Sequence, residues 1–349
     1  GSKWLVLSSE FNYEEQKQQF IYDVANAYFT VLQYKDILDS NIAAQNSNRL
    51  AYTQAKERKK VGLATQNDVL QALASYDSSR ASVIQSRNDL QTQIFNLSVY
   101  TGKVYTDLNN LDESFLFNLP KYSLDKWVKL AQSNNKKVKS QQYNQEYYSY
   151  NLSGAKASFL PNLNIAAAYG HTGHNGTFQT TAPAKRNYSV ALNLSWNLFN
   201  GGKDFATVEQ NAYNFGAQEA DTIYQIRFIM AQTKADYKLV ESNMLQAKAN
   251  LAAVNAQKEA VKQALAQYEA GVSPSSSSDN DNASDNMSGM ENYLYQISLL
   301  LASEQAYAKS KYDYLTSSLA LAHDAGVLSI AEIKSLNTWL VRKELLDSI

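Results

Sequence analysis

The histidines of this chain are candidate metal ligands. Two of the three, His171 and His174, are spaced i, i+3 in the sequence HTGH, and the third is His323. Such a pair could ligate a metal, but no Cys or acidic residue lies near it in the sequence. The 349-residue chain has no Cys, no nucleophile elbow and no phosphate loop. We therefore predict no catalytic residues, no metal site, no cofactor and no enzymatic activity.

An acidic, serine-rich run is the second place where side chains could bind something. Residues 273–286, SPSSSSDNDNASDN, supply three carboxylates, Asp279, Asp281 and Asp285, and Glu291 follows shortly after. This composition predicts a solvated, flexible loop. Two interpretations remain open. The run is either a surface loop in which an insertion costs little, or an acidic fringe at a channel mouth or a partner surface.

The composition excludes some function classes and allows very long helices. The formal net charge is −1, so the chain lacks the basic excess that is typical of nucleic-acid binding, and we predict no nucleic-acid partner. The chain has 4 Pro and 13 Gly, which leaves long stretches without a helix breaker. We find no run of about 18 apolar residues, so no transmembrane helix is predicted.

Helical periodicity dominates the first part of the chain. Residues 10–60 contain no Pro or Gly, and apolar residues recur at helical spacing there and again in 67–99. Between them lies VGLATQ (61–66), in which Gly62 can terminate one helix and Thr65 can cap the next. This pattern predicts a long helical hairpin. Helices of this length need other helices packed along them, as in a coiled coil.

The helical hairpin recurs later, with an insertion at its tip. Gly62 aligns with Gly271, 209 positions further on, whereas Gly102 aligns with Gly326, 224 positions further on. The difference of 15 positions equals the length of residues 273–287. The acidic run is therefore an elaboration of the second hairpin tip.

Residues 162–200 have a different pattern, with strict alternation typical of two β-strands and a loop between them. One face of the second strand carries Tyr188, Val190, Leu192, Leu194, Trp196 and Leu198, and the other face carries Ser, Ala and Asn. A two-stranded hairpin is at best marginally stable alone, so it must join other strands. The apolar face could pack into a soluble sandwich or face lipid in a membrane barrel.

In their order along the chain these features resemble the TolC-type outer-membrane efflux family. The segments that carry the resemblance are ANAYFTVL (25–32), RKKVGLATQNDVLQA (58–72), LSVYTGK (97–103), ASFLPNLNIAAAYG (157–170), LSWNLFNGG (194–202) and LAQYEAGV (265–272). The resemblance covers nearly the whole chain, and the internal repeat supports it. We therefore expect a mainly α fold with a β-hairpin, in which long helical hairpins form a periplasmic α-barrel and the strands contribute to a trimeric outer-membrane β-barrel.

The resemblance implies a function and a set of partners. We expect an outer-membrane exit duct of a tripartite efflux or type I secretion system in a Gram-negative bacterium, assembled as a homotrimer. Its expected partners are a periplasmic adaptor protein, an inner-membrane pump and outer-membrane lipid. An alternative is a periplasmic helical scaffold or interaction protein without channel activity.

The resemblance also implies site residues. The family's adaptor-binding tip corresponds here to Val61, Gly62, Leu63, Ala64 and Thr65, and the second repeat keeps Gly271 and Val272 before the insertion. The family narrows the tunnel entrance with acidic residues near the second tip. Asp279, Asp281, Asp285 and Glu291 could form that ring here, whereas Asp68 is expected to cap or pair locally.

The expected organisation has five segments. They are a first helical hairpin (3–102, tip 61–66), equatorial helices (103–158), a β-hairpin for the membrane (159–202), a second helical hairpin (203–326, tip 271–290) and a C-terminal equatorial segment (327–349). Family members carry two strand hairpins, and this chain shows one. We therefore expect it to be a piece of a longer protein that lacks the first helix and the first hairpin.

Overall fold

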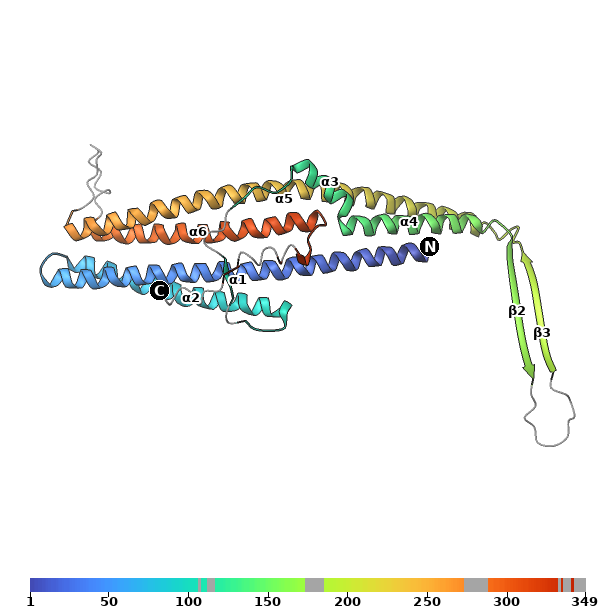
Figure 1. Cartoon of the computed structure of the whole chain (residues 1–349), viewed down its shortest axis with the longest axis horizontal. Coiled ribbons are helices and arrows are strands. Elements are labelled where there is room, and N and C mark those ends of the chain that lie inside the picture. Colours follow the sequence, from blue (N-terminus) through green and yellow to red (C-terminus); the bar gives the residue numbers. More distant parts are fainter. Residues whose placement is uncertain are drawn as a thin grey trace, which may run out of the picture. The chain divides into compact units, whose positions relative to one another are not determined.

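The computed structural model describes residues 1–105, 108–111, 117–172, 185–272, 288–331, 334 and 340–341. It divides into two compact units, which we call the strand unit (residues 1–12 and 137–227) and the bundle unit (13–136 and 228–349). The two longest helices, α1 (Ser2–Lys60) and α5 (Lys203–Ala270), contribute residues to both units (Figure 1).

Four helices lie side by side in the bundle unit: α1, α2 (Gln66–Thr101), α5 and α6 (Gly289–Asp324) (Figure 1). The helices begin and end within a few residues of the predicted positions, except that α1 starts earlier, at Ser2. Two buried clusters hold them together. One contains Phe29, Leu32, Trp127, Val240, Tyr312 and Leu319, and the other lies beside the tips.

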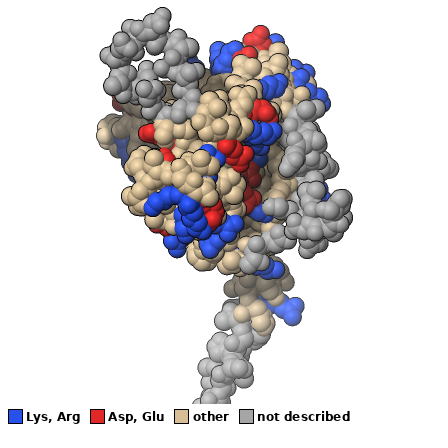
Figure 2. Space-filling model, turned by 90° about the vertical axis from the view of Figure 1, so that its left-hand side faces the viewer, with Lys and Arg blue, Asp and Glu red and all other residues tan. Residues whose placement is uncertain are grey.

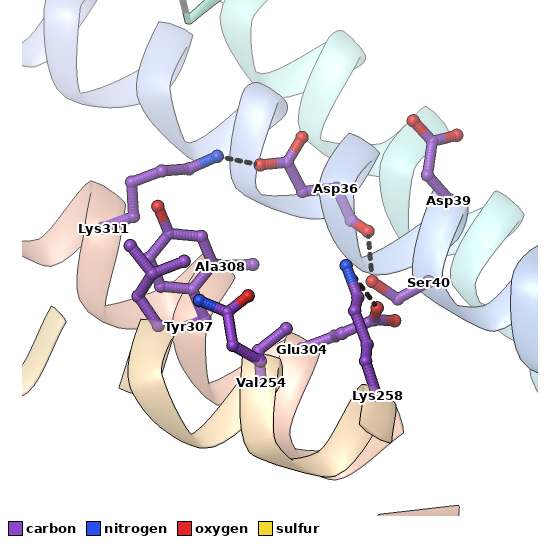
Figure 3. Close-up of a pocket in the computed structure, with 11 residues that line it drawn as sticks. Asp36, Asp39, Ser40, Val254, Lys258, Glu304, Tyr307, Ala308 and Lys311 are labelled. Carbon is purple, nitrogen blue, oxygen red and sulfur yellow. Dashed lines mark hydrogen bonds and ion pairs between the residues drawn. The ribbon is translucent and has the colours of Figure 1, made fainter. Parts of the chain in front are cut away.

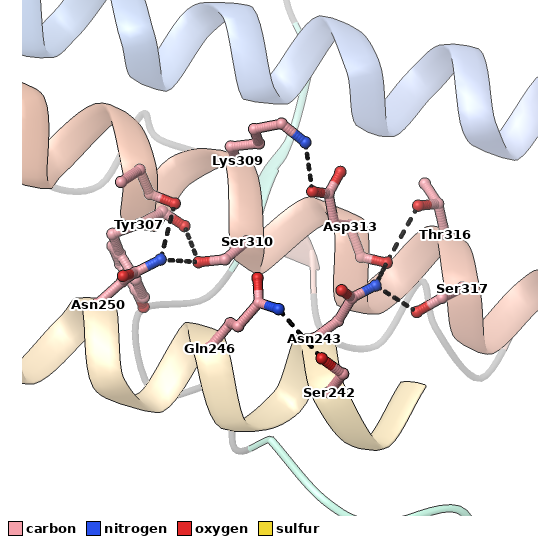
Figure 4. A network of polar contacts seen from close by, with 11 residues as sticks. Ser242, Asn243, Gln246, Asn250, Tyr307, Lys309, Ser310, Asp313, Thr316 and Ser317 are labelled. Carbon is pink, nitrogen blue, oxygen red and sulfur yellow. Dashed lines mark hydrogen bonds and ion pairs between the residues drawn. The ribbon is translucent and has the colours of Figure 1, made fainter. Parts of the chain in front are cut away.

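Polar residues at seven-residue spacing form a seam between α5 and α6 (Figure 4). Asn243 donates a hydrogen bond to Ser317 Oγ at 3.1 Å, and Asn250 donates one to Ser310 Oγ at 3.0 Å. Both amides also bond to backbone carbonyls of α6. Polar residues at core positions of paired helices specify one register, so this seam fixes how the antiparallel helices slide against each other.

Two ion pairs line a cavity of about 230 Å³ among α1, α5 and α6 (Figure 3). Lys311 of α6 pairs with Asp36 of α1, and both side chains are largely buried. Lys258 of α5 lies 3.8 Å from Glu304 of α6. The Asp36 carboxylate also accepts a hydrogen bond from the Tyr312 hydroxyl at 3.1 Å. The contacts of Asp36 with Lys311 and Tyr312 join the two helical hairpins, whereas the Lys258–Glu304 pair joins the two helices of the second hairpin.

The connecting segments of the bundle unit are short elements. The pattern of SLDKWVKLAQSN (123–134) predicts an amphipathic helix, and this helix is present as α3 (Leu124–Asn134). The pattern of SIAEIKSLNTWLV (329–341) predicts a second amphipathic helix. This prediction is wrong at its end, because β4 (Leu340–Val341) is a strand paired with β1 (Asn110–Leu111). Such a pairing depends on a partner about 230 positions away, which no local pattern reveals.

The strand unit combines the first turns of α1, the helix α4 (Lys136–Ala157), the hairpin and the first part of α5. Aromatic rings join α1 to α4: Tyr143 stacks against Trp4 and Phe11 with ring centroids 5.8 and 5.3 Å apart. Ser8 and Ser140 share a buried hydrogen bond of 3.0 Å. Gln218 of α5 donates a hydrogen bond to Gln141 of α4 at 2.7 Å.

The hairpin consists of β2 (Asn162–Thr172) and β3 (Lys185–Ser195), paired antiparallel along their whole length. Trp196 and Leu198 were predicted to continue the second strand, and the structure places both beyond its end. Asn162 pairs with Ser195 as the last rung, and the preceding residue, Pro161, has no N–H with which to extend the ladder. The Trp196 indole instead donates to the Phe159 carbonyl at 3.2 Å.

No described helix is long and apolar enough to cross a membrane. The predicted segment boundaries are not tested by the division into two units, so they remain predictions.

Candidate functional site: helical tips and strand hairpin

The first tip is built by local backbone chemistry. Gly62 adopts the left-handed conformation, with φ +78°, which a residue with a Cβ rarely adopts. Its N–H donates to the Lys59 carbonyl at 3.0 Å, and the Leu63 N–H donates to the Arg58 carbonyl at 2.8 Å. These bonds satisfy the last carbonyls of α1 and end the helix.

Thr65 and Asp68 then start α2 with a reciprocal capping box. The Thr65 hydroxyl oxygen accepts from the Asp68 N–H at 3.1 Å, and the Asp68 carboxylate accepts from the Thr65 N–H at 2.8 Å. Both local predictions, Thr65 as the N-cap and Asp68 as a capping partner, are confirmed. The turn is therefore satisfied on both sides without help from a partner.

The second tip repeats the same geometry at its helix end. Gly271 has φ +71°, its N–H donates to the Tyr268 carbonyl at 3.1 Å, and the Val272 N–H donates to the Gln267 carbonyl at 3.0 Å. The bonded positions are the same as in the first tip, counted back from each glycine. Helix α6 begins after Ser288, whose hydroxyl oxygen accepts from the Glu291 N–H at 3.1 Å.

Apolar side chains are left uncovered at both tips. Val61 is 70 % exposed, Leu63 is 66 % exposed and Val272 is 56 % exposed. Ala64 is half-buried, and Thr65 is exposed. Because the turns are already satisfied by their own hydrogen bonds, these side chains contribute little to the fold, and their apolar surface is available to a partner.

A compact core lies directly beside the two tips. Its residues come from all four helices of the bundle unit: Ala51, Ala55, Val69, Ala72, Ala264, Tyr268, Met290, Tyr293 and Ile297. The small alanines let the helices approach closely, and the Tyr268 and Tyr293 rings stack with centroids 6.5 Å apart. This core holds the tips rigidly, so a partner would meet preorganised surfaces.

Arg58 ties the first tip to the second. Its guanidinium lies 4.8 Å from the centre of the Tyr268 ring, a cation–π contact, and Nη1 donates to the Glu269 carbonyl at 3.0 Å. Gln54 also donates to the Glu269 carboxylate at 3.1 Å. Burial raises the pKa of the Tyr268 hydroxyl, and the nearby Arg58 charge partly opposes that effect.

The charge at the tips is mixed, with a basic end on the first one. The last turn of α1 carries Arg58, Lys59 and Lys60, and Lys60 pairs with Glu57. Figure 2 views the end of the bundle unit that carries the tips and shows basic and acidic side chains around uncharged surface. Charges of both signs close to exposed apolar residues are compatible with a protein contact surface, whose border is usually polar.

The hairpin presents one uncovered apolar face, formed by cross-strand pairs. Leu163 pairs with Leu194, Ile165 with Leu192, Ala167 with Val190 and Tyr169 with Tyr188, and the large side chains among them are all exposed. The opposite face pairs small and polar residues, such as Asn164 with Asn193. From Leu163 to Tyr169 this face spans roughly 20 Å, and it ends in a Tyr pair whose rings are 5.1 Å apart.

The remaining predicted site residues have different positions. Asp279, Asp281, Asp285 and His174 lie outside the described residues. Glu291 is exposed in the first turn of α6. His171 lies in β2 opposite Arg186, and His323 lies near the end of α6 with Nδ1 2.9 Å from the Asp324 carboxylate. Within the described ranges no group of three His, Cys, Asp or Glu residues could hold a metal ion.

We expect the capping box to contribute measurably to stability. Replacing Thr65 by Ala removes the side-chain acceptor for the Asp68 N–H, and we predict a loss of about 1 kcal/mol in the free energy of unfolding. Thr92→Ala on α2 is the control, because Thr92 bonds only to the Asn88 carbonyl one turn before it. Urea denaturation of the two variants would test this, and equal midpoints would contradict the assignment of the cap.

A family model described as "Outer membrane efflux protein" matches residues 2–103 and 127–287 of this chain. The chain belongs to the outer membrane efflux protein family. The outer membrane protein TolC of Salmonella enteritidis is 27 % identical over 358 residues, with 97 % of this chain and 69 % of TolC covered. The alkaline protease secretion protein AprF of Pseudomonas aeruginosa is 24 % identical, with 94 % of this chain and 66 % of AprF covered.

Solved structures of outer membrane channels share the fold of this efflux protein. The CmeC outer membrane channel of Campylobacter jejuni superposes with a TM-score of 0.73 at 17 % sequence identity, and covers 97 % of this chain and 70 % of CmeC. The mainly α fold with a β-hairpin is thus confirmed. Family membership places this efflux protein in the outer membrane, with its helices in the periplasm.

Sequence reasoning missed the contacts that join the two repeats of this efflux protein. Arg58, which lies one turn before Gly62, contacts the second tip. Its position at the end of the first helix is the signal in the sequence that could have placed it there. The seven-residue spacing of Asp236, Asn243 and Asn250 on α5 is a second signal in the sequence, and it points to the seam between α5 and α6.

Proposed function

We propose that this outer membrane efflux protein is the exit duct of a tripartite efflux or type I secretion system. It works as a homotrimer in which the long helices surround a tunnel through the periplasm and the hairpins join a closed sheet in the outer membrane. A periplasmic adaptor binds the tips and connects the duct to an inner-membrane pump, which supplies the energy. Conduction through the duct itself is passive.

The repeated tip geometry is the observation that carries this proposal. Val61, Leu63 and Val272 are exposed although each follows a helix end whose hydrogen bonds are complete. Uncovered apolar residues on rigid turns are typical of contact sites for another protein. We assign Val61, Gly62, Leu63, Ala64 and Thr65, together with Gly271 and Val272, to the adaptor contact.

The uncovered face of the hairpin supports the membrane part of the proposal. We assign Tyr188, Val190, Leu192 and Leu194 to contact with lipid, and the Tyr169–Tyr188 pair to the interface region where aromatic rings gather. Trp196 and Leu198 follow the strand and belong to the other end of the same apolar band.

An acidic entrance ring extends the proposal. Glu291 is exposed next to the second tip, and three copies of Asp279, Asp281, Asp285 and Glu291 would surround the opening of a trimer. A ring of carboxylates lowers the energy of cations at a pore mouth. We therefore expect charge-removing substitutions at these four positions to reduce the preference of the channel for cations in planar bilayers.

Single-cysteine cross-linking tests the adaptor contact, since the chain contains no Cys of its own. We expect Leu63→Cys to form a cross-link with the purified periplasmic adaptor of the same organism, and Leu63→Glu to weaken adaptor binding at least about tenfold, because a buried unpaired charge at an interface is costly.

Val99→Cys is the matched control for this experiment. Val99 is also apolar and highly exposed, but it lies near the other end of α2. Cross-linking from Val99 with equal yield, or unchanged binding of the Leu63→Glu variant, would show that the tips are not the adaptor site.

A further inference from the structure

The polar seam between α5 and α6 has a pair of acidic residues at one position. Two of its rungs pair an amide with a hydroxyl, Asn243 with Ser317 and Asn250 with Ser310. Seven residues before Asn243 on α5 is Asp236, and seven residues after Ser317 on α6 is Asp324. Because the helices are antiparallel, these two residues occupy the next rung. This rung therefore places two carboxyl groups where the others have neutral partners.

The two carboxyls cannot both be ionised and still bond to each other. Asp236 is only 5 % exposed, and its Oδ2 atom is buried without a hydrogen-bond donor among the described residues. Gln232 donates to the other oxygen, Oδ1, at 3.1 Å, and Asp324 occupies the facing position of the same rung on α6. A carboxylate is only an acceptor, so a bond across this rung needs one shared proton.

Titratable groups of α1 and α6 lie near the pair. Helix α1 contributes the Tyr22 hydroxyl and the Asp23 carboxylate, and α6 contributes His323, whose Nδ1 lies 2.9 Å from Asp324 Oδ1. The chain between α3 and α4 contributes Asn135, which is uncharged. Burial, followed by the facing Asp324, raises the pKa of Asp236 to about 7, whereas Gln232 and His323 act in the opposite direction.

The pair lies where the end of α6 is attached to its neighbours. The Asp324 carbonyl accepts a hydrogen bond from the Asn135 side chain at 2.9 Å, and the Leu328 carbonyl accepts one from the Gln18 side chain of α1 at 2.8 Å. The turn that follows is closed by N–H donors of residues 325–328 bonded to carbonyls of the last turn of α6. Loss of the contact between Asp236 and Asp324 would therefore destabilise this turn directly.

We propose that Asp236 and Asp324 form a proton-operated clasp, which holds the C-terminal end of α6 against α1 and α5 at acidic pH and releases it at alkaline pH. The closed clasp binds the shared proton more tightly than the open one, in which Asp236 is solvated and has its ordinary acidity. Its stabilising effect is therefore complete below about pH 4 and decreases as the pH rises. It is lost above about pH 7, where the closed pair releases its proton. The proposal does not depend on the tips or on the proposed duct function.

Hydrogen exchange of the intact protein in detergent tests the clasp. We expect the amides of residues 325–328 to lose protection by at least about tenfold between pH 5 and pH 8, after correction for the chemical exchange rate. Asp236→Asn recreates the neutral rung seen at Asn243, so its protection should be independent of pH over this range.

Asp313→Asn is the matched control, because Asp313 lies on the same helix but its carboxylate pairs with Lys309 at the surface. It should keep the full pH dependence. Amides of the first tip, residues 62–68, should show no such change in any variant. The clasp is overturned if wild-type protection at 325–328 is the same at both pH values, or if Asp236→Asn retains the wild-type pH dependence.

Should Asp236→Asn fail to fold, Asp324→Asn removes the same carboxyl pair from the other helix. It leaves the Asp324 carbonyl contact with Asn135 in place, because that contact uses the backbone. The same loss of pH dependence is expected, and its absence would overturn the clasp equally.

Discussion

Replacing Leu192 by Arg should remove this protein from the outer membrane. Leu192 lies in the middle of β3, pairs with Ile165 and is exposed on the apolar face of the hairpin. An arginine at the mid-plane of a lipid-facing strand costs about 2–4 kcal/mol per copy, and the proposed trimer would carry three copies. We expect the amount of protein that fractionates with outer membranes to fall at least about tenfold.

Asn193→Arg is the neighbouring control. Asn193 pairs with Asn164 on the opposite face of the same strands, so in the proposed barrel an arginine there would extend into a wet lumen. We expect nearly normal amounts in the outer membrane and a change only in ion selectivity. If both variants insert equally well, the apolar face does not contact lipid. If Asn193→Arg is the worse of the two, the faces have been assigned the wrong way round.

Gly326→Ala should destabilise the bundle unit strongly. Gly326 has φ +67°, and a Cβ there would lie 2.4 Å from the Asn134 carbonyl oxygen and 2.7 Å from the Asn135 nitrogen. Both neighbours are backbone atoms, which cannot rotate away as the end of a side chain can. The left-handed conformation costs about 1–2 kcal/mol and forced overpacking about 1–3 kcal/mol. The free energy of unfolding should therefore fall by about 2–5 kcal/mol.

Gly102→Ala separates these two causes. Gly102 has almost the same backbone angle, φ +68°, but no atom of the described residues lies within 4 Å of a Cβ added there. It should lose only the conformational part, about 1–2 kcal/mol. Chemical denaturation of both variants would measure the difference. Equal losses would mean that the close approach of the turn after α6 to the end of α3 does not matter for stability.

Gly102 and Gly326 also show where sequence reasoning ends. The internal repeat aligns them as equivalent helix ends, and both do terminate a helix with a left-handed glycine. Whether a side chain would fit depends on what packs against each position. Asn134 lies against Gly326, whereas none of the described residues lies against Gly102, and this difference belongs to tertiary packing. A local pattern carries no information about it.

The elements whose chemistry is local could be predicted from the sequence. The long helices follow from the absence of Pro, the scarcity of Gly and the apolar periodicity, because each helical hydrogen bond spans only four residues. The tip at Gly62, Thr65 and Asp68 follows for the same reason, since every bond in it joins residues at most five positions apart. The alternation of the hairpin followed from the two-residue period of a strand.

The long-range contacts were decided only by the tertiary structure. Arg58 reaches Tyr268, Asp236 faces Asp324, and Asn110–Leu111 pairs with Leu340–Val341. Residues that are far apart in the chain can meet in many ways, and only the packed helices select one. The sequence alone thus determined the helices, the turn at the first tip and the two-faced hairpin. The tertiary structure decided which buried charges meet, because burial and proximity exist only after packing.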